Sequence, residues 1–301
     1  MAETDRVLSI QSHVVRGYVG NRSAVFPLQV LGFEVDFVNS VQLCNHTWYK
    51  HIAGQVLESD DLRVLIDGLK ANDLIDYSYL LTGYIGSKSF QEEVLKVVQE
   101  LKDLCPGLKY VCDPVMGDNG QMYVPEELAP TYREKFVAIA DIITPNQFEL
   151  EILSGMAIKT EQDALQAMKL LQEKGAKNVV LSSGELGREK DIMVTMGRSE
   201  SGDVFRIEFP RLEANFVGSG DVFAALLLAW SEKHPDNLQL ACEKTISSLQ
   251  AILKRTLSSA EAQAKGGTPN IGQLELRLVQ SKADIENPPT GIVKAGPVYD
   301  S

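Results

Sequence analysis

The tetrapeptide Gly-Ser-Gly-Asp at residues 218–221 precedes the apolar run 222–230, and its residue types are well suited to phosphate chemistry. Two glycines let the backbone approach a ligand closely, and the unpaired N–H groups of a first helical turn bind phosphate. A rigid set of such donors stabilises the charge that develops in phosphoryl transfer. Asp221 could then take the proton from an attacking hydroxyl. The alternative is that Asp221 only caps the helix.

Two carboxylates, Asp113 and Asp118, lie five residues apart, directly after the predicted strand 109–112. Ligands bind at the carboxyl ends of parallel strands, so both side chains should face a binding crevice. Hard oxygen ligands suit Mg²⁺, which is commonly shared with nucleotide phosphates. A turn built on Asp-Pro and Gly-Asp would explain the same residues, and the segment alone does not decide between the two.

Two further polar segments follow predicted strands. Asn146 and Glu149 share one face of a first helical turn, where they could serve a site or form a capping box. Ser182 and Ser183 offer hydroxyl and amide groups that suit phosphate oxygens, although a plain turn fits equally well. The sequence contains no GxxxxGK[ST] loop, so any nucleotide must be held in another way.

Three ring side chains lie beyond the ends of predicted strands. His13 and His46 could be acid-base groups, but the histidines have no metal-ligand spacing, and loop hydrogen bonding is the simpler role. Tyr84 could cover an aromatic ligand or merely close a strand. The two segments that contain His13 and His46 should overlook the same crevice.

The elements that position these residues alternate along the chain. Short apolar runs precede segments with helical periodicity, such as 90–104, in which Val94, Val98 and Leu101 form one apolar stripe. This alternation favours an α/β fold, with a mainly parallel central sheet and helices on both faces. The segments 192–196 and 204–209 predict an antiparallel hairpin at one edge. The predicted strands are 7–10, 33–38, 79–82, 109–112, 141–144 and 178–181, and the predicted helices are 24–31, 60–69, 90–104, 147–153, 161–173, 221–230, 238–257 and 272–279.

The composition excludes several classes of protein. The chain has 301 residues, 44% of them hydrophobic, and we expect a single domain over residues 1–285 and a flexible tail over 286–301. The 29 Lys and Arg residues against 41 Asp and Glu residues give a net charge of −12, which opposes nucleic-acid binding. Four scattered cysteines indicate neither a disulfide framework nor a zinc site, and favour the cytoplasm. No apolar run reaches the ~18 residues that span a membrane.

Taken together, the motifs GSGD (218–221), DPVMGD (113–118) and TPNQFE (144–149) resemble the ribokinase-like superfamily, and within it the pyridoxal kinase family. The resemblance extends from residue 7 to residue 282. It implies transfer of the γ-phosphoryl group of ATP to the 5′-hydroxyl of pyridoxal, pyridoxine or pyridoxamine, which gives pyridoxal 5′-phosphate from pyridoxal. It also implies Mg²⁺ with the ATP, other divalent ions being possible, a monovalent cation such as K⁺, and a homodimer.

The resemblance also implies roles for individual residues. Asp221 would be the general base, and the amides of residues 218–220 the anion hole. The contacts to the pyridine ring and its substituents would be Ser12, Val19, Thr47, Tyr84 and Asp221. The nucleotide-binding positions would be Asp113, Asp118, Tyr123, Asn146, Glu149, Ser182, Ser183, Leu212, Phe216, Gly218, Ser219 and Gly220. The positions around the cations would be Asp113, Asp118, Thr144, Glu149 and Ser182.

The chain departs from the family pattern at two points. Ser219 stands where animal members commonly have Thr, which keeps the hydroxyl and the amide. Only residues 119–122 separate Asp118 from Tyr123, so the flap over the phosphates should be shorter than in vertebrate members. Two alternatives stay open at this point, namely a hydroxymethylpyrimidine-type kinase of the same superfamily and a non-catalytic vitamer-binding protein.

Overall fold

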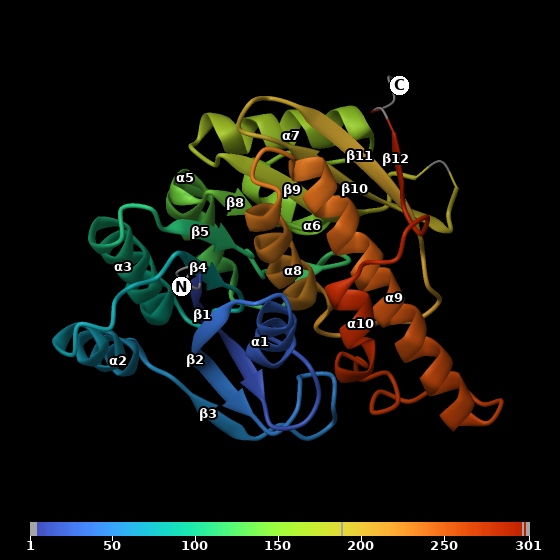
Figure 1. Cartoon of the computed structure of the whole chain (residues 1–301), viewed down its shortest axis with the longest axis horizontal. Helices are drawn as coiled ribbons and strands as arrows, with labels where there is room; N and C mark the ends of the chain where they lie inside the picture. The colour runs from blue at the N-terminus through green and yellow to red at the C-terminus, as the bar shows by residue number, and fades with distance from the viewer. Residues whose placement is uncertain (1–4, 188, 297, 299–301) are drawn as a thin grey trace.

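A ten-stranded mixed sheet forms the centre of the protein in a computed structural model, which describes residues 5–187, 189–296 and 298. The strand order is β12-β11-β10-β9-β8-β5-β4-β1-β2-β3, from the upper right to the bottom of Figure 1. The α/β class and the mainly parallel sheet are confirmed. The strands are β1 (Arg6–Val14), β2 (Glu34–Leu43), β3 (Gly54–Val56), β4 (Tyr79–Thr82), β5 (Lys109–Cys112), β8 (Ile142–Ile143), β9 (Asn178–Gly184), β10 (Ile192–Arg198), β11 (Val204–Pro210) and β12 (Lys294–Gly296).

Parallel pairing is confined to the middle of the sheet, where β9, β8, β5, β4, β1 and β2 are neighbours. The predicted hairpin is β10 paired with β11, and β10 joins the sheet antiparallel to β9. Two antiparallel edge strands were not predicted: β3, which pairs with β2, and β12, which pairs with β11. Each has only three residues, too few to show an alternating pattern. Residues 297 and 299–301 of the expected tail lie outside the described residues.

Two layers of helices cover the sheet because its strands bury alternate side chains on opposite faces. In β5, Tyr110 and Cys112 belong to one hydrophobic core and Val111 to the other. The first core contains side chains of α2 (Ser59–Ala71), α3 (Lys88–Leu104), α4 (Ala129–Thr131), α5 (Val137–Ile139), α6 (Gln147–Ser154) and α7 (Glu161–Glu173). The second contains side chains of α1 (Asn21–Val30), α8 (Ser219–Lys233), α9 (Leu238–Ala264) and α10 (Lys282–Glu286).

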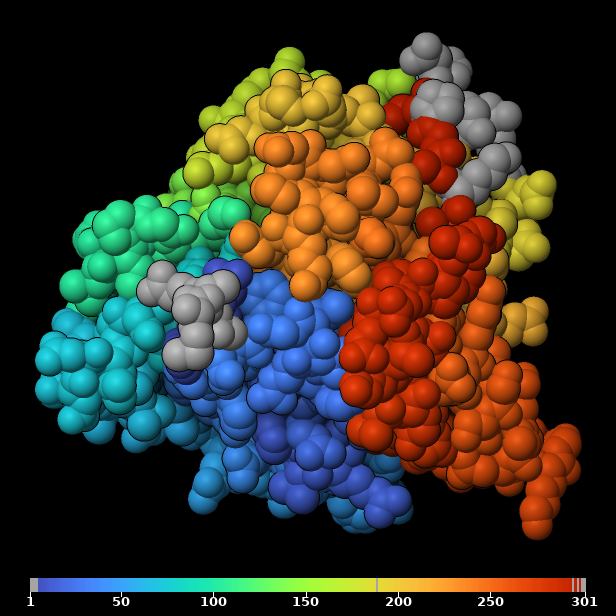
Figure 2. All heavy atoms as spheres, viewed as in Figure 1, coloured from blue at the N-terminus to red at the C-terminus, as the bar shows by residue number. Residues whose placement is uncertain are grey.

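The predicted helix 272–279 is wrong. Residues 271–278 form turns and irregular chain, followed by the short helix Val279–Ser281 and by α10. Leu276 and Leu278 point into the second core and are 1% and 0% exposed, so the buried residues alternate instead of recurring with helical periodicity. Figure 2 shows the C-terminal segment (red) on the surface between N-terminal residues (blue) and α9 (orange).

The helical stretch 126–139, which was also not predicted, contributes side chains to the first core. It consists of a 3-10 turn, α4, the π-helix Tyr132–Phe136 and α5. Tyr132 and Phe136 are fully buried there. Because the stretch changes helix type within fourteen residues, no single periodicity marks it in the sequence. Among the described residues, no helix is long and apolar enough to cross a membrane.

Candidate active site

A cleft of about 1530 Å³ opens beyond the carboxyl ends of the parallel strands. It gathers every predicted site residue, although these come from segments spread over two hundred positions of the chain. The sequence prediction that they meet in one place is therefore confirmed, while their individual roles stay predictions. The predicted residues that line the cleft are Ser12, Val19, Thr47, Tyr84, Asp113, Asp118, Tyr123, Thr144, Asn146, Glu149, Ser182, Ser183, Leu212, Phe216, Gly218, Ser219, Gly220 and Asp221.

The glycines at the start of α8 are held close to other backbone. Gly218 has φ of 84°, and a Cβ built on it would lie 2.0 Å from the carbonyl oxygen of Tyr18. Only glycine fits both that conformation and that approach. The helix then begins at Ser219, and residues 222–230 are all buried, so the first turn is fixed in position. Its unpaired N–H groups lie at the cleft, as an anion site requires.

Asp221 lies in this first turn but does not cap it. No side chain caps α8; the Asp221 Oδ2 instead accepts a hydrogen bond of 2.8 Å from the backbone N–H of Gly20, which precedes α1. Burial raises the pKa of Asp221 to about 6, and the hydrogen bond from Gly20 partly opposes this shift. A carboxylate with this pKa accepts a proton more readily than an ordinary aspartate.

Asp113 follows β5 and is only 6% exposed. Its Oδ1 accepts a hydrogen bond of 3.3 Å from the Thr144 hydroxyl. Burial raises the pKa of Asp113 well above its usual value, and the negative charges of Glu149 and Asp221 raise it further. Three acidic groups, one from the loop after β5 and two from the first turns of α6 and α8, therefore lie close enough to repel one another, and a bound cation would relieve this repulsion.

Glu149 and Asn146 form the capping box that the sequence allowed. The Asn146 side chain accepts a 2.9 Å hydrogen bond from the Glu149 N–H, and Glu149 Oε2 accepts one of 2.9 Å from the Asn146 N–H. Glu149 Oε1 also accepts hydrogen bonds from the N–H groups of Met116, at 2.9 Å, and Gly117, at 3.4 Å. Burial nevertheless raises the pKa of Glu149 to about 7. Glu149 thus ties α6 to the loop of Asp113 and also lines the cleft.

The short segment after Asp118 is a two-residue hairpin. The strands β6 (Gly117–Asp118) and β7 (Gln121–Met122) pair antiparallel, and Asn119 and Gly120 between them have φ of 50° and 75°. Such positive φ values are typical of the tight turn that Asn-Gly favours. The Asn119 N–H donates to Asp118 at 2.8 Å, and burial raises the pKa of the Asp118 carboxyl. Tyr123, just beyond the hairpin, is 47% exposed.

Ser182, at the predicted nucleotide end of the cleft, is hydrogen-bonded through both its hydroxyl and its carbonyl group. The Ser182 hydroxyl donates to the carbonyl oxygen of Pro145 at 3.3 Å, and the Ser182 carbonyl accepts from the Thr195 hydroxyl at 2.6 Å. Leu212 and Phe216 are partly buried against the second core, and present apolar surface to the same end. This end thus offers hydroxyl groups beside apolar surface, as a nucleotide site needs.

The vitamer end predicted by the resemblance contains both histidines. His46 Nδ1 accepts a hydrogen bond of 3.3 Å from the Trp48 N–H, in agreement with the loop role that the sequence favoured. Burial lowers the pKa of His13, which also lines the cleft. For Tyr84, burial raises the pKa of the phenol, so the hydroxyl stays protonated at neutral pH.

Three features of the cleft were not predicted. Gly20 supplies the N–H that orients Asp221, and the glycines of segment 17–20 were the available signal. Trp48 lines the cleft beside Thr47. Arg211 is the only Lys or Arg among the described residues that line the cleft, against seven carboxylates, and it forms an ion pair with Glu185. No pattern in the sequence marked Arg211.

The donor set suits cations that arrive with phosphates better than a resident metal. In the described part of the chain, no group of three or more His, Cys, Asp and Glu side chains is arranged to hold a metal ion. The carboxylates of Asp113, Asp118 and Glu149 nevertheless share the cleft without a cationic side chain close enough to lower their pKa values. Mg²⁺ commonly binds through one or two carboxylates together with the phosphates of a nucleotide.

Comparisons with known proteins agree with this geometry. A family model described as Phosphomethylpyrimidine kinase matches residues 58–267. The chain is 56% identical to pyridoxal kinase of Sus scrofa over 94% of this chain and 92% of the relative, and 54% identical to that of Homo sapiens over 96% and 97%. It is also similar to the solved structure of Leishmania donovani pyridoxal kinase in complex with ADP and pyridoxine. That match has a TM-score of 0.88 and 35% identity, and covers 98% of this chain and 99% of the other.

Proposed function

Because the chain belongs to the pyridoxal kinase family, we propose that its cleft transfers the γ-phosphoryl group of ATP to the 5′-hydroxyl of pyridoxal with Asp221 as the base. The protein is a kinase that phosphorylates B6 vitamers, the acceptor being an alcohol. Pyridoxine and pyridoxamine are the further substrates. With pyridoxal, the product is pyridoxal 5′-phosphate, so the reaction returns the unphosphorylated vitamer to its phosphorylated form.

The environment of Asp221 is the observation that carries this mechanism. Its pKa of about 6 leaves the carboxyl ionised at neutral pH, yet basic enough to accept the hydroxyl proton as the oxygen attacks phosphorus. The hydrogen bond from Gly20 fixes one carboxylate oxygen, and the other remains for the substrate. The N–H groups of residues 218–220 then stabilise the negative charge that develops on the transferred group.

Cations complete the phosphate end of the site. Mg²⁺ bound to ATP would neutralise phosphate charge and help to align the transfer. Asp113, Asp118 and Glu149 are the carboxylates that would hold it, and the Thr144 and Ser182 oxygens suit a monovalent cation such as K⁺. Burial raises the pKa values of Asp113 and Glu149, and neighbouring carboxylates raise them further, which supports this arrangement because a positive ion would offset both effects.

The remaining residues align the two substrates. Ser12, Thr47 and Tyr84 supply hydroxyl groups to the pyridine ring and its substituents, while Val19 packs on the ring. At the nucleotide end, Asn146, Ser182 and Ser183 contact phosphates, Leu212 and Phe216 enclose the adenine, and Tyr123 covers the phosphates. Holding the hydroxyl in line with the phosphate contributes to catalysis, because the entropic cost of bringing the two reactants together is met on binding.

We expect a homodimer in the cytoplasm. The edge strand β3 is exposed along its whole length, and the exposed side chains of Val56 in β3 and of Phe37 in the adjacent strand β2 provide apolar surface for a second copy. The four cysteines are free, which supports a reducing compartment. Sedimentation at micromolar concentration tests the dimer, and Val56→Lys should shift the protein toward the monomer if this edge is the interface.

The reaction is tested by measuring ADP release from Mg·ATP in the presence of K⁺, with pyridoxal, pyridoxine or a hydroxymethylpyrimidine as acceptor. We expect turnover with the pyridines and its loss in Asp221→Ala. The pyrimidine acceptor tests the alternative substrate class, because the matching family model is described as Phosphomethylpyrimidine kinase. Turnover with the pyrimidine alone would contradict the substrate assignment, and pyridoxal binding without turnover would support the non-catalytic alternative.

A further inference from the structure

A nearly buried carboxylate outside the cleft has no role in the mechanism described above. Glu275 lies in the irregular segment 271–278, and its side chain is 14% exposed. It does not line the cleft, but it lines a second cavity of about 330 Å³ that shares His46 and Trp48 with the cleft. Any influence of Glu275 on the substrate must therefore pass through other residues.

The Glu275 carboxylate joins two loops that are far apart in the sequence. Its Oε2 accepts a hydrogen bond of 3.1 Å from the N–H of Tyr18. Its Oε1 accepts one of 2.9 Å from the Tyr49 hydroxyl and lies 3.4 Å from His46 Nε2. Burial alone would raise the pKa of Glu275, but His46, Tyr49 and Tyr18 together hold it below the usual value. The carboxylate is thus ionised and fully engaged at neutral pH.

These two loops carry both ends of the vitamer site. Beside Tyr18 lie Val19, which lines the cleft, and Gly20, whose N–H holds Asp221. Between His46 and Tyr49 lie Thr47 and Trp48, which also line the cleft. A displacement of the carboxylate would therefore move the ring contacts and the support of the base together.

The orientation of His46 depends on the same contact. Its Nδ1 accepts the Trp48 N–H, so the proton of the neutral ring is on Nε2, which faces Glu275. The ring also contacts that of Tyr49, with centroids 4.7 Å apart. Glu275 thus favours one tautomer and one orientation of a ring that lines the cleft.

Glu275 is held rigidly from both sides. A Cβ on Gly17, which has φ of 98°, would lie 2.5 Å from both of its carboxylate oxygens. On the other side, Leu276 and Leu278 are buried in the second core, and the Arg277 N–H donates to the Thr256 hydroxyl at 3.0 Å. The segment 271–278 therefore holds the Glu275 carboxylate in a fixed position against the two N-terminal loops.

We propose that Glu275 is a positioning residue that sets the geometry of the vitamer site by holding the loops of Val19 and Thr47 together. This inference rests on the proposed function, because it assigns the vitamer to that end of the cleft. The proposal predicts different effects on the two substrates. The contacts to the vitamer depend on Glu275, whereas the nucleotide contacts at residues 144–149 and 182–183 do not.

The test compares steady-state kinetics of the wild type, Glu275→Gln and Tyr49→Phe, with Glu261→Gln as the matched control. Glu261 is an exposed glutamate that lines the same small cavity. We expect Glu275→Gln to raise the KM for pyridoxal about tenfold while the KM for ATP changes less than about twofold. Tyr49→Phe should give a smaller change in the same direction, and the double variant should be non-additive because both residues act through one contact. Glu261→Gln should match the wild type.

Two results would overturn the proposal. One is an unchanged KM for pyridoxal in Glu275→Gln. The other is an equal loss with both substrates that follows the fraction of folded protein in thermal unfolding, since that would be a purely structural role. A wild type that does not phosphorylate pyridoxal at all would instead overturn the proposed function, and this proposal with it.

Discussion

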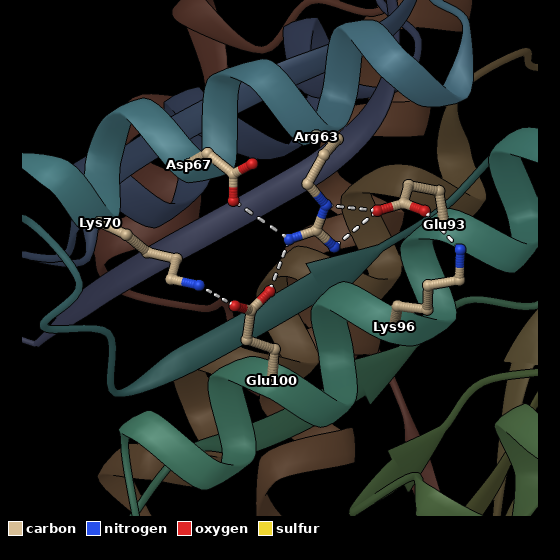
Figure 3. Close-up of polar contacts among 6 residues, drawn as sticks. All are labelled: Arg63, Asp67, Lys70, Glu93, Lys96 and Glu100. Atoms are coloured by element: carbon tan, nitrogen blue, oxygen red, sulfur yellow. Dashed lines mark hydrogen bonds and ion pairs between the residues drawn. The ribbon is translucent and has the colours of Figure 1, made fainter.

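The carboxylates of the cleft and those between α2 and α3 have opposite surroundings. Between the two helices, Arg63 bridges Glu93, at 2.7 Å, and Glu100, at 2.7 Å, while Lys96 and Lys70 pair with the same two glutamates (Figure 3). Hydrogen bonds from Lys70 and Arg63 lower the pKa of Glu100, and that of Glu93 is also lowered although burial opposes the shift. These charges are balanced within the protein.

In the cleft, by contrast, burial raises the pKa of every carboxylate assigned to the site. Their hydrogen-bond donors are backbone N–H groups, the Thr144 hydroxyl and the Asn119 side-chain amide instead of cationic side chains. The α2–α3 cluster therefore stabilises the fold, whereas the cleft retains an excess of acidic groups over cationic side chains. We infer that the cations which accompany ATP supply the missing positive charge.

The largest expected effect comes from removing the base. Asp221→Asn keeps the shape of the side chain but removes the basic carboxylate, so kcat should fall by at least about 10²-fold. The affinity for ATP should stay within about twofold, because the N–H groups of residues 218–220 remain. Stopped-time product assays and equilibrium ATP titration measure the two quantities. Wild-type turnover in this variant would remove Asp221 from the mechanism.

A smaller effect is expected at the phosphate end. Asp118→Ala should raise the KM for Mg·ATP about tenfold and leave pyridoxal affinity unchanged, because Asp118 is proposed to act through the cation. Asp103→Ala, at an exposed position of α3 away from the cleft, provides a surface control. Weaker pyridoxal binding with normal ATP kinetics would contradict the assignment of Asp118 to the phosphate end of the cleft.

The smallest effect on activity is expected from the paired region. Arg63→Ala leaves two glutamates with one lysine partner each, and it should reduce the free energy of unfolding by about 1–2 kcal/mol. Turnover should be unchanged, because none of these residues lines the cleft. Denaturant unfolding and the ADP-release assay make the comparison. A selective loss of activity in fully folded protein would show that the two regions are coupled.

Strong local patterns predicted the parallel part of the fold and the meeting of the site residues. The strand β5 and the helices α6 and α7 begin at the predicted residues 109, 147 and 161. The two helices have sharp starts because the side chains of Asn146 and Thr160 cap them. The edge strands β3 and β12 were missed because three residues are too few to show an alternating pattern. The strand β12 and the segment 271–278 also depend on neighbours distant in the sequence. Tertiary contacts override local periodicity there.

Within the site, residue types predicted the acidic groups but not their partners. Neither the hydrogen bond of Gly20 to Asp221 nor the contacts of Glu275 with Tyr18 and Tyr49 could be deduced, because they join segments more than two hundred residues apart. Asn146 and Glu149 form the capping box that their spacing allowed, and both also line the cleft. The two interpretations of this segment were therefore not exclusive.

The charge deficit of the cleft is tested most directly by unfolding the protein across pH 5 to 8, with and without Mg²⁺ and K⁺, in the wild type and in Asp113→Asn. The folded-state pKa values of Glu149, about 7, and Asp221, about 6, lie above those of unfolded carboxyls, so their contribution to stability is lost as pH rises through these values. Taking the difference between the two proteins removes titrating groups elsewhere in the chain.

Without the cations, the wild type should lose stability relative to Asp113→Asn as pH rises from 5 to 8, because the variant lacks the Asp113 carboxyl, whose pKa burial and the charges of Glu149 and Asp221 raise well above its usual value. Adding Mg²⁺ and K⁺ should stabilise the wild type more than the variant at pH 8. Equal pH dependence in both proteins, together with equal stabilisation by the cations, would contradict the account.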